Sequence, residues 1–109
     1  MIIATIRMSI PPSKSAEALK ILRLITELCR DDPGCNCCHI YADLEEKNDL
    51  ILEEVWRARE NLDLHLRSDE FHNLLVAMEM SLKEPEIRFN TISSSAGMEM
   101  VEMARNQAR

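Results

Sequence analysis

A tryptophan and a histidine nine residues apart are the side chains of this chain best suited to chemistry on a small molecule. Trp56 is the only tryptophan among 109 residues, and His65 follows it on a predicted helix. An indole can stack on a flat aromatic ligand and donate one hydrogen bond. A neutral imidazole beside a pocket can accept a proton from a substrate. The pair therefore predicts a site for an aromatic molecule with an ionisable hydroxyl, although large aromatic side chains also serve core packing.

Glu54 lies two residues before Trp56, on the same face of a predicted strand. It can orient His65 as a base, or it can be a buried carboxylate that caps a nearby helix. His65 can itself be the base, or it can bond Glu54 or a backbone carbonyl and so fix its helix. Apolar walls would keep the imidazole neutral, because burial disfavours its charged form. The predicted walls are Ile6, Leu52, Leu75 and Met78.

The run Cys35-Asn36-Cys37-Cys38 raises the question of a metal or redox site. In a regular strand, Cys35 and Cys37 share a face with His39. Strand residues i and i+2 lie about 6.5 Å apart, which is too far for two thiolates on one zinc ion. The same spacing would strain a disulfide between Cys35 and Cys37. We therefore expect no metal and four free thiols, and the role of these three cysteines stays open.

The charge and composition of the chain argue against several classes of binding partner. The net charge is −6 and the lysines and arginines are scattered, which argues against nucleic acid and anionic membrane surfaces. No stretch is long enough for a transmembrane helix, and the first ten residues are too short and interrupted for a signal peptide. Four cysteines without a targeting signal predict a cytoplasmic protein with reduced thiols. Neither G-x-G-x-x-G nor a P-loop is present.

The elements that position these residues follow from hydrophobic periodicity. Alternating apolar residues predict four strands, at about residues 1–10, 35–44, 49–58 and 87–94. Apolar stripes at helical spacing predict helices at about residues 13–30, 61–67, 68–84 and 98–107. Ser13 or Ser15 can cap the first helix and Ser68 the third, which Pro85 ends. The third helix carries a predicted buried stripe of Phe71, Leu74, Leu75, Met78 and Leu82.

The order β-α-β-β-α-β predicts one α+β domain with a ferredoxin-like fold. Its four strands would form an antiparallel sheet in the order 4-1-3-2, with the helices on one face. Residues 1–96 would form this domain and residues 97–109 a C-terminal tail helix. Both faces of strand 49–58 carry apolar residues, such as Ile51 and Val55. We therefore expect a second copy to cover the free face about a two-fold axis.

The chain resembles the antibiotic biosynthesis monooxygenase family in three features: Glu54-x-Trp56, His65, and Ser68-x-x-Phe71. The resemblance is strongest over residues 34–71, and the order of elements extends it over residues 2–94. It implies a dimeric α+β barrel and, in the quinol monooxygenase-like branch, an oxygenase that uses no metal or flavin. The deprotonated substrate would pass an electron to oxygen, while the protein supplies burial, stacking and proton removal.

Two branches of that family have polar groups that this chain lacks. The polyketide-oxidising branch has an asparagine four strand positions before the tryptophan, where this chain has Leu52. The haem-degrading branch needs an asparagine, a tryptophan and a histidine at positions that align with Ile6, His65 and Leu75. None of the three matches, so haem degradation is not expected.

The sequence therefore predicts a homodimer with a mainly apolar pocket beside Trp56. Its leading function is cofactor-independent oxygenation of a small aromatic or quinol-type substrate, with no nucleic-acid or membrane partner. The alternative is a non-catalytic small-ligand-binding or structural dimer, because a fold does not fix a function. The thin polar lining favours the alternative, whereas Trp56 and His65 favour the enzyme. The physiological substrate does not follow from the sequence.

Overall fold

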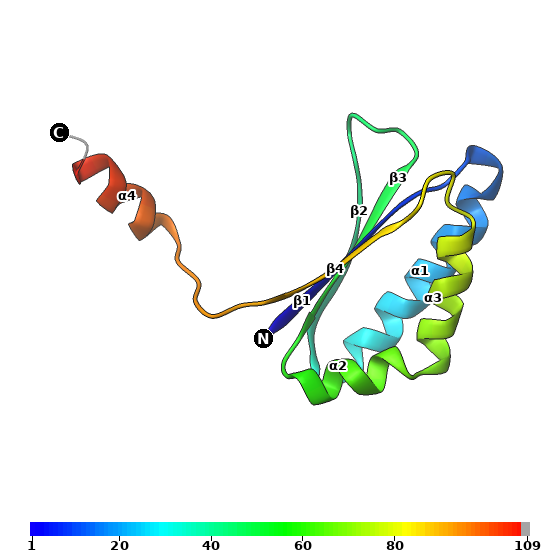
Figure 1. Cartoon of the computed structure of the whole chain (residues 1–109), viewed down its shortest axis with the longest axis horizontal. Helices are drawn as coiled ribbons and strands as arrows, with labels where there is room; N and C mark the ends of the chain where they lie inside the picture. Colours follow the sequence, from blue (N-terminus) through cyan, green and yellow to red (C-terminus); the bar gives the residue numbers. More distant parts are fainter. Residues whose placement is uncertain (108–109) are drawn as a thin grey trace.

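A four-stranded sheet with helices on one face makes up the body of the protein. The computed structural model describes residues 1–107. Figure 1 shows the sheet with helices α1, α2 and α3 together on one side of it. The strands are β1 (Ile2–Ser9), β2 (Cys35–Ala42), β3 (Asp49–Trp56) and β4 (Glu86–Thr91). The helices are α1 (Ser15–Arg30), α2 (Arg59–Leu66), α3 (Asp69–Glu79) and α4 (Met98–Gln107), with a short 3₁₀ turn, η1 (Pro12–Lys14), before α1.

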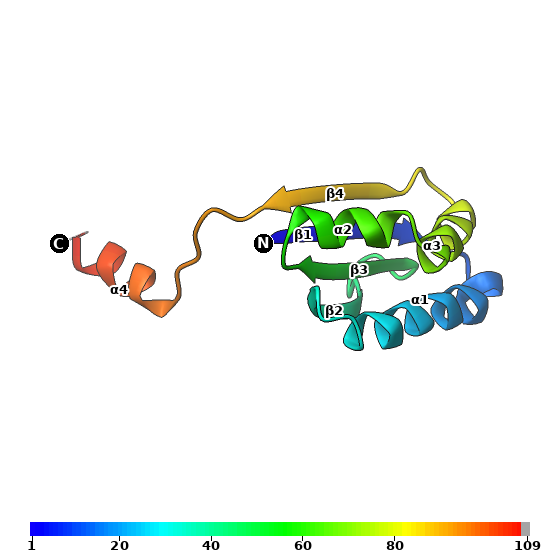
Figure 2. The same cartoon turned by 90° about the horizontal axis from the view of Figure 1, so that it is seen from below.

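The strands lie in the order β2-β3-β1-β4, and all neighbours are antiparallel. Figure 2 shows β2 and β4 at the two edges of the sheet. The central strands β1 and β3 pair along their whole length, with Ile2 opposite Trp56 and Ser9 opposite Asp49. The predicted ferredoxin-like α+β fold and its strand order are therefore confirmed.

The core lies between the sheet and helices α1 and α3. Alternate residues of β1 and β3 face the helices and are buried, as their period of two requires. Each large apolar side chain buried in this way contributes about 1.5–3 kcal/mol. The core members from the sheet include Ile2, Ile6, Met8, Leu52 and Trp56, and those from the helices include Ala18, Leu22, Ile25, Cys29, Leu74 and Ala77.

The opposite face of the sheet carries no helix of the described chain, and we call it the open face (Figure 1). Ile51 and Val55 are half-buried there, among polar neighbours. Arg7 Nη1 lies 3.0 Å from Asp43 Oδ2 and 2.8 Å from Asp49 Oδ2, so one guanidinium joins β1 to the turn between β2 and β3. A single chain thus covers one face of its sheet only.

The helix ends differ in part from the sequence prediction. Lys14 occupies the N-cap position of α1 and makes no side-chain cap bond, so the predicted serine caps are wrong there. The cap of α3 is confirmed, because Ser68 Oγ accepts a hydrogen bond from the Phe71 N–H at 3.2 Å. Helix α3 ends at Glu79, well before Pro85, because the Leu82 N–H donates to the Ser9 carbonyl of β1 at 2.7 Å. Leu82 is therefore exposed and does not extend the buried stripe.

The strand ends also shift by a few residues. Strand β2 ends at Ala42, two residues early, because Asp43 Oδ1 accepts from the N–H groups of Glu45 and Glu46 and begins the turn. Strand β3 ends at Trp56 rather than at residue 58, and β4 at Thr91 rather than at residue 94. Helix α2 accordingly begins two residues earlier than predicted.

Helix α4 stands apart from the body at the end of an extended segment that follows β4 (Figures 1 and 2). Its residues are exposed, including the apolar side chains of Met98, Met100, Val101 and Met103. The helix coincides with the predicted tail helix over residues 98–107. Within residues 1–107, no helix has the length and apolar character needed to cross a membrane.

Candidate functional site

An aromatic stack lies in the core where β3 ends and α2 begins. Trp56 is 0 % exposed and His65 is 4 % exposed. Their ring centroids are 4.5 Å apart with 30° between the planes, and Phe71 meets the imidazole edge-on at 5.6 Å. Helix α2 is short and buries only Leu62 and His65, which are three residues apart and share its inner face. The predicted placement of His65 over the indole is therefore confirmed.

Glu54 joins the stack through both carboxylate oxygens and is itself 0 % exposed. Its Oε1 accepts a long hydrogen bond of 3.4 Å from Trp56 Nε1, and its Oε2 lies 2.9 Å from His65 Nε2. The ring N–H direction misses that oxygen, so Nε2 has a close electrostatic contact without an aligned hydrogen bond. Glu54 thus contacts His65 and Trp56, whereas the N-cap of α2 has no side-chain bond. We call these three residues together with Cys29 the buried cluster.

Cys29 is the member of the buried cluster that sequence reasoning missed. Its thiol comes from the last turn of α1 and donates to Glu54 Oε2 at 3.6 Å. Hydrogen bonding with the Cys38 thiol, burial and the Glu54 carboxylate all raise the pKa of Cys29. The position of Cys29 on the apolar stripe of α1 indicated burial, but the sequence gives no sign of its polar partner.

A β-bulge changes the arrangement expected for the cysteines of β2. Cys35 pairs with Trp56 and Cys37 with Val55, so the chain gains one residue, Asn36, between them. Cys35 therefore lies on the helix side with the buried Cys38, and Cys37 is exposed. The prediction that Cys35 and Cys37 share one strand face is wrong.

The same bulge brings two cysteines three residues apart to one side of the sheet. Cys35 and Cys38 form a C-x-x-C pair, and both lie on the side of the sheet that carries Cys29. Burial, followed by the neighbouring Cys29, raises the pKa of Cys35 to about 12. All four cysteines are free thiols in the structure.

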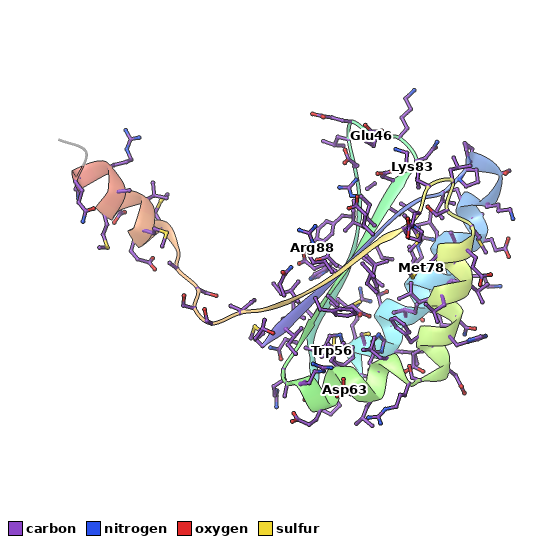
Figure 3. All side chains as sticks on the ribbon, in the orientation of Figure 1. Glu46, Trp56, Asp63, Met78, Lys83 and Arg88 are labelled. Carbon is purple, nitrogen blue, oxygen red and sulfur yellow. The ribbon has the colours of Figure 1, made fainter. Side chains whose placement is uncertain are left out.

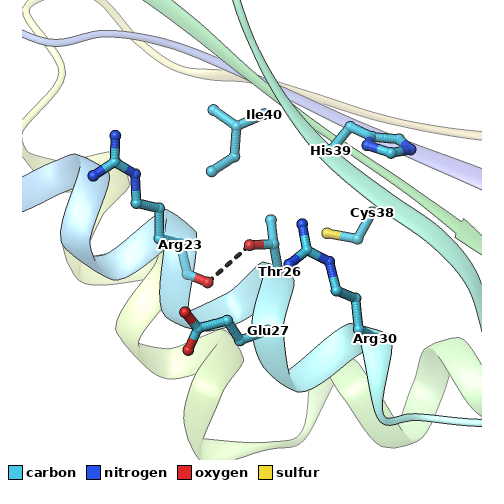
Figure 4. A pocket seen from close by; sticks show the side chains of 7 residues that line it. All are labelled: Arg23, Thr26, Glu27, Arg30, Cys38, His39 and Ile40. Carbon is cyan, nitrogen blue, oxygen red and sulfur yellow. Dashed lines mark hydrogen bonds between the residues drawn. The ribbon is translucent and has the colours of Figure 1, made fainter.

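A polar cleft of about 380 Å³ opens between α1 and β2 and reaches the Cys38 thiol. Figure 4 shows the Cys38 sulfur pointing from β2 toward α1, with Arg23 and Arg30 at the rim. Thr26 Oγ1 donates to the Arg23 carbonyl at 2.8 Å on the helix side. The lining residues are Arg23, Thr26, Glu27, Arg30, Cys38, His39 and Ile40. Cys38 thus connects the cleft with Cys29 of the buried cluster.

The four residues predicted as pocket walls differ in their burial. Ile6 and Leu52 are fully buried, and Met78 is half-buried against the core. Figure 3 shows Trp56 in the layer between sheet and helices, with Met78 on α3. Leu75 is 44 % exposed, because Leu74 takes the core position on α3. The prediction that Leu75 belongs to the buried stripe is wrong.

Two further apolar side chains, which sequence reasoning did not assign to the site, lie on the helix side of the edge strand β4. Phe89 pairs with Ala4 and Ile87 with Ile6, so both point to the same side as the core. They are nevertheless 44 % and 41 % exposed, respectively. The helix side of the sheet is therefore only partly covered at its β4 edge.

Comparison with known families tests the resemblance seen in the sequence. The family model described as antibiotic biosynthesis monooxygenase matches residues 1–75, which is more than half of the chain. The chain belongs to the antibiotic biosynthesis monooxygenase family. The matched residues include Glu54, Trp56, His65 and Phe71. The resemblance predicted from the sequence is confirmed.

Individual relatives of this family member agree with the fold and leave the substrate open. The uncharacterized protein sll1783 of Synechocystis is 31 % identical over 87 residues, which cover 79 % of this chain and 59 % of that protein. The chain therefore spans about three fifths of that relative's length. A conserved protein of Methanosarcina mazei superposes with a TM-score of 0.75 at 28 % identity, covering 82 % of this chain and 89 % of that one.

A solved structure named antibiotic biosynthesis monooxygenase gives a TM-score of 0.76 at 18 % identity. The superposition covers 86 % of this chain and all of the other, 100 %. At this identity the likeness shows the fold alone. The comparisons thus establish the family and the fold of the chain, and they do not identify its reaction or its substrate.

Proposed function

We propose that this chain is a cofactor-independent monooxygenase of a small aromatic or quinol-type substrate. The observation that carries the proposal is the buried stack of His65 on Trp56, with the Glu54 carboxylate 2.9 Å from Nε2. Buried ionisable groups in contact are costly to fold around, and they gather at functional sites. Membership in a family named for monooxygenases supports this class of reaction.

The residues of the buried cluster divide the chemistry between them. A substrate ring packs against the aromatic groups Trp56 and Phe71, while its hydroxyl reaches the ring nitrogen of His65 that does not face Glu54. The imidazole removes the hydroxyl proton, and the adjacent carboxylate of Glu54 stabilises the imidazolium that forms. The resulting electron-rich anion passes an electron to O₂, and the substrate radical and superoxide combine through a new C–O bond. Cleavage of the O–O bond then leaves one oxygen atom on the ring and releases the other as water, with all electrons supplied by the substrate. Ile6 and Leu52 exclude water from the reacting ring.

Access to the cluster requires α2 to move, because Trp56 and Glu54 are fully buried in the closed chain. The helix has eight residues and holds the core through only Leu62 and His65. Short elements with few buried side chains open at low free-energy cost. The exposed apolar pair Ile87 and Phe89 on β4 supplies a surface on which an incoming ring can first pack.

The closed packing is also the observation that favours the alternative function. A polar group enclosed by core side chains can serve fold specificity alone. On that account the chain is a non-catalytic small-ligand-binding or structural dimer. A measurement of substrate turnover distinguishes the monooxygenase from the non-catalytic dimer.

We infer further that the working form is a homodimer in a reducing cytosol. The half-buried apolar residues of the open face, Ile51 and Val55, support pairing with a second copy. The four free thiols support a reducing compartment.

Oxygen consumption by metal-free, chelator-treated protein tests the proposed function. With a panel of quinols and anthrones, at least one substrate should give uptake that depends on the protein. His65→Ala should lower the rate by roughly 10²-fold or more, the usual contribution of a positioned base. His72→Ala is the matched control, because His72 is exposed on α3. Equal rates for His65→Ala and the parent would refute the base; no uptake with any substrate would favour the alternative.

A further inference from the structure

We propose that Cys29, Glu54 and His65 form a binding site for a thiophilic divalent cation of the Zn²⁺ class. The ligand atoms Cys29 Sγ, Glu54 Oε2 and His65 Nε2 all lie within 4.8 Å of one another. Two of the separations are 3.6 Å, from sulfur to oxygen, and 2.9 Å, from nitrogen to oxygen. Tetrahedral zinc, with bonds of about 2.0–2.3 Å, places neighbouring ligand atoms about 3.3–3.8 Å apart. The three atoms therefore stand close to three corners of a zinc coordination shell.

The chemistry of the three groups fits such a cation. A thiolate, an imidazole and a carboxylate are the ligand types that zinc takes in proteins. A thiolate and a carboxylate together carry two negative charges, so a bound dication leaves the buried site neutral. Among the buried side-chain nitrogens and oxygens of residues 1–107, His65 Nε2 lacks an aligned hydrogen bond, and a cation at this point gives it a partner.

The surroundings supply an outer shell and a path to solvent. Trp56 Nε1 donates to Glu54 Oε1 and fixes the carboxylate's orientation, so that Oε2 faces Cys29 and His65 and can bind the cation once the thiol loses its proton. The three protein ligands leave the fourth position of a tetrahedral shell to water, and the Cys38 thiol interacts with Cys29 from the β2 side. Cys38 also lines the polar cleft between α1 and β2, so the cleft offers a path for the ion (Figure 4).

This site differs from the cysteine run of β2, for which the strand spacing predicts no metal. That run belongs to a single strand, whereas the three ligands here come from α1, β3 and α2. Binding stands independently of the oxygenase reaction. One consequence rests on the proposed function: a cation on His65 Nε2 lowers the basicity of the imidazole and takes the Glu54 carboxylate from it, so it should stop turnover.

Titration of reduced, full-length protein with Co²⁺ tests the site, because cobalt replaces zinc and reports its ligands by absorption. We expect one equivalent to give a thiolate-to-cobalt charge-transfer band, which Zn²⁺ then abolishes by displacement. Cys29→Ser should remove the band and weaken binding at least about 100-fold, since even outer-shell changes cost 10–100-fold. Cys37→Ser is the matched control, because Cys37 is the exposed cysteine, and it should retain the band.

The melting temperature is a second readout, which distinguishes a variant that has lost the site from one that has lost the fold. Zn²⁺ should raise the melting temperature of the parent and of Cys37→Ser, and should leave that of the near-isosteric Glu54→Gln almost unchanged. Absence of the band in the parent, or its loss in Cys37→Ser with retention in Cys29→Ser, overturns the proposed site. A band without loss of oxygen uptake leaves the site standing and argues against His65 as the base.

Discussion

At the scale of single residues, the molecule is unusual in placing the carboxylate of Glu54 at the centre of its core. A buried carboxylate is tolerated only where partners compensate for lost hydration. Its partners here are Trp56 Nε1 on β3, Cys29 Sγ on α1 and His65 Nε2 on α2. One residue thus ties together the strand and the two helices that enclose the candidate site.

Replacing Glu54 should therefore be far more damaging than replacing its neighbour in sequence. Glu54→Ala should lower the free energy of unfolding by about 3–5 kcal/mol, because it leaves buried polar groups without a partner. Glu53→Ala should change it by about 0.5 kcal/mol or less, since Glu53 faces the other side of β3 and is partly exposed. Chemical denaturation of both variants gives the comparison, and similar losses for the two would contradict this role of Glu54.

The sequence predicted part of the buried cluster for a clear physical reason. Strand alternation puts Glu54 and Trp56 on one face, and the short helix that follows must turn His65 back onto that face. Cys29 could not be predicted, because its contact with Glu54 depends on how α1 lies across the sheet. Leu75 was misplaced because Leu74 and Leu75 both fit a helical stripe, and packing decides which one faces inward.

At the scale of elements, α2 is the helix that closes over the buried cluster, because it carries His65. The loop before β2 lies against α2 at Gly34. A Cβ added to Gly34 would lie 2.5 Å from Asn61 Nδ2 and 2.7 Å from Asn61 Cβ, on α2. The absence of a side chain at Gly34 thus lets the loop and helix α2 approach closely.

Gly34→Ala should accordingly push α2 away from the loop. We expect a loss of about 1–3 kcal/mol of stability, as for other overpacked sites, and faster amide exchange along α2. Gly97→Ala is the matched control, because its added Cβ would meet only the end of the Glu99 side chain, at 3.0 Å. Hydrogen-exchange mass spectrometry measures both effects. Unchanged exchange in α2 of Gly34→Ala would mean that this contact does not hold the helix.

The existence and order of the elements could be read from the sequence, while their irregularities could not. Alternation in residues 2–9 and 49–56 required two strands, and the stripe from Leu22 to Cys29 required a helix. The bulge at Asn36 leaves no such mark, because the cysteines on either side of it suit a buried or an exposed position. The early end of α3 follows from a bond between Leu82 and Ser9, residues 73 apart, which local periodicity does not register.

At the scale of the whole molecule, one sheet face and helix α4 carry apolar side chains that no other element of residues 1–107 covers. The open face presents half-buried Ile51 and Val55, and α4 presents exposed Met98 and Val101 away from the body. Exposed apolar surface of this kind marks an interaction site. In the proposed homodimer, a second copy related by a two-fold axis would cover the open face with its own open face.

Light scattering at micromolar concentration should give a mass about twice the 12.5 kDa of the chain. Ile51→Asp should shift the mass toward the monomer, because each copy would bring an unpaired carboxylate into the apolar interface. Leu64→Asp, at an exposed position of α2 on the helix side, should leave the mass unchanged. A parent protein that is monomeric under these conditions would rule out the dimer.

The most direct test of the account is whether a quinol reaches Trp56. Because Trp56 is the only tryptophan, the protein's indole fluorescence reports on the candidate site alone. An anaerobic titration with a reduced quinol, corrected against free tryptophan amide, should give a saturable change with one ligand per chain. Emission that changes no more than that of the free amide, at concentrations that support oxygen uptake, would show that the ligand binds elsewhere and that Trp56 serves the core only.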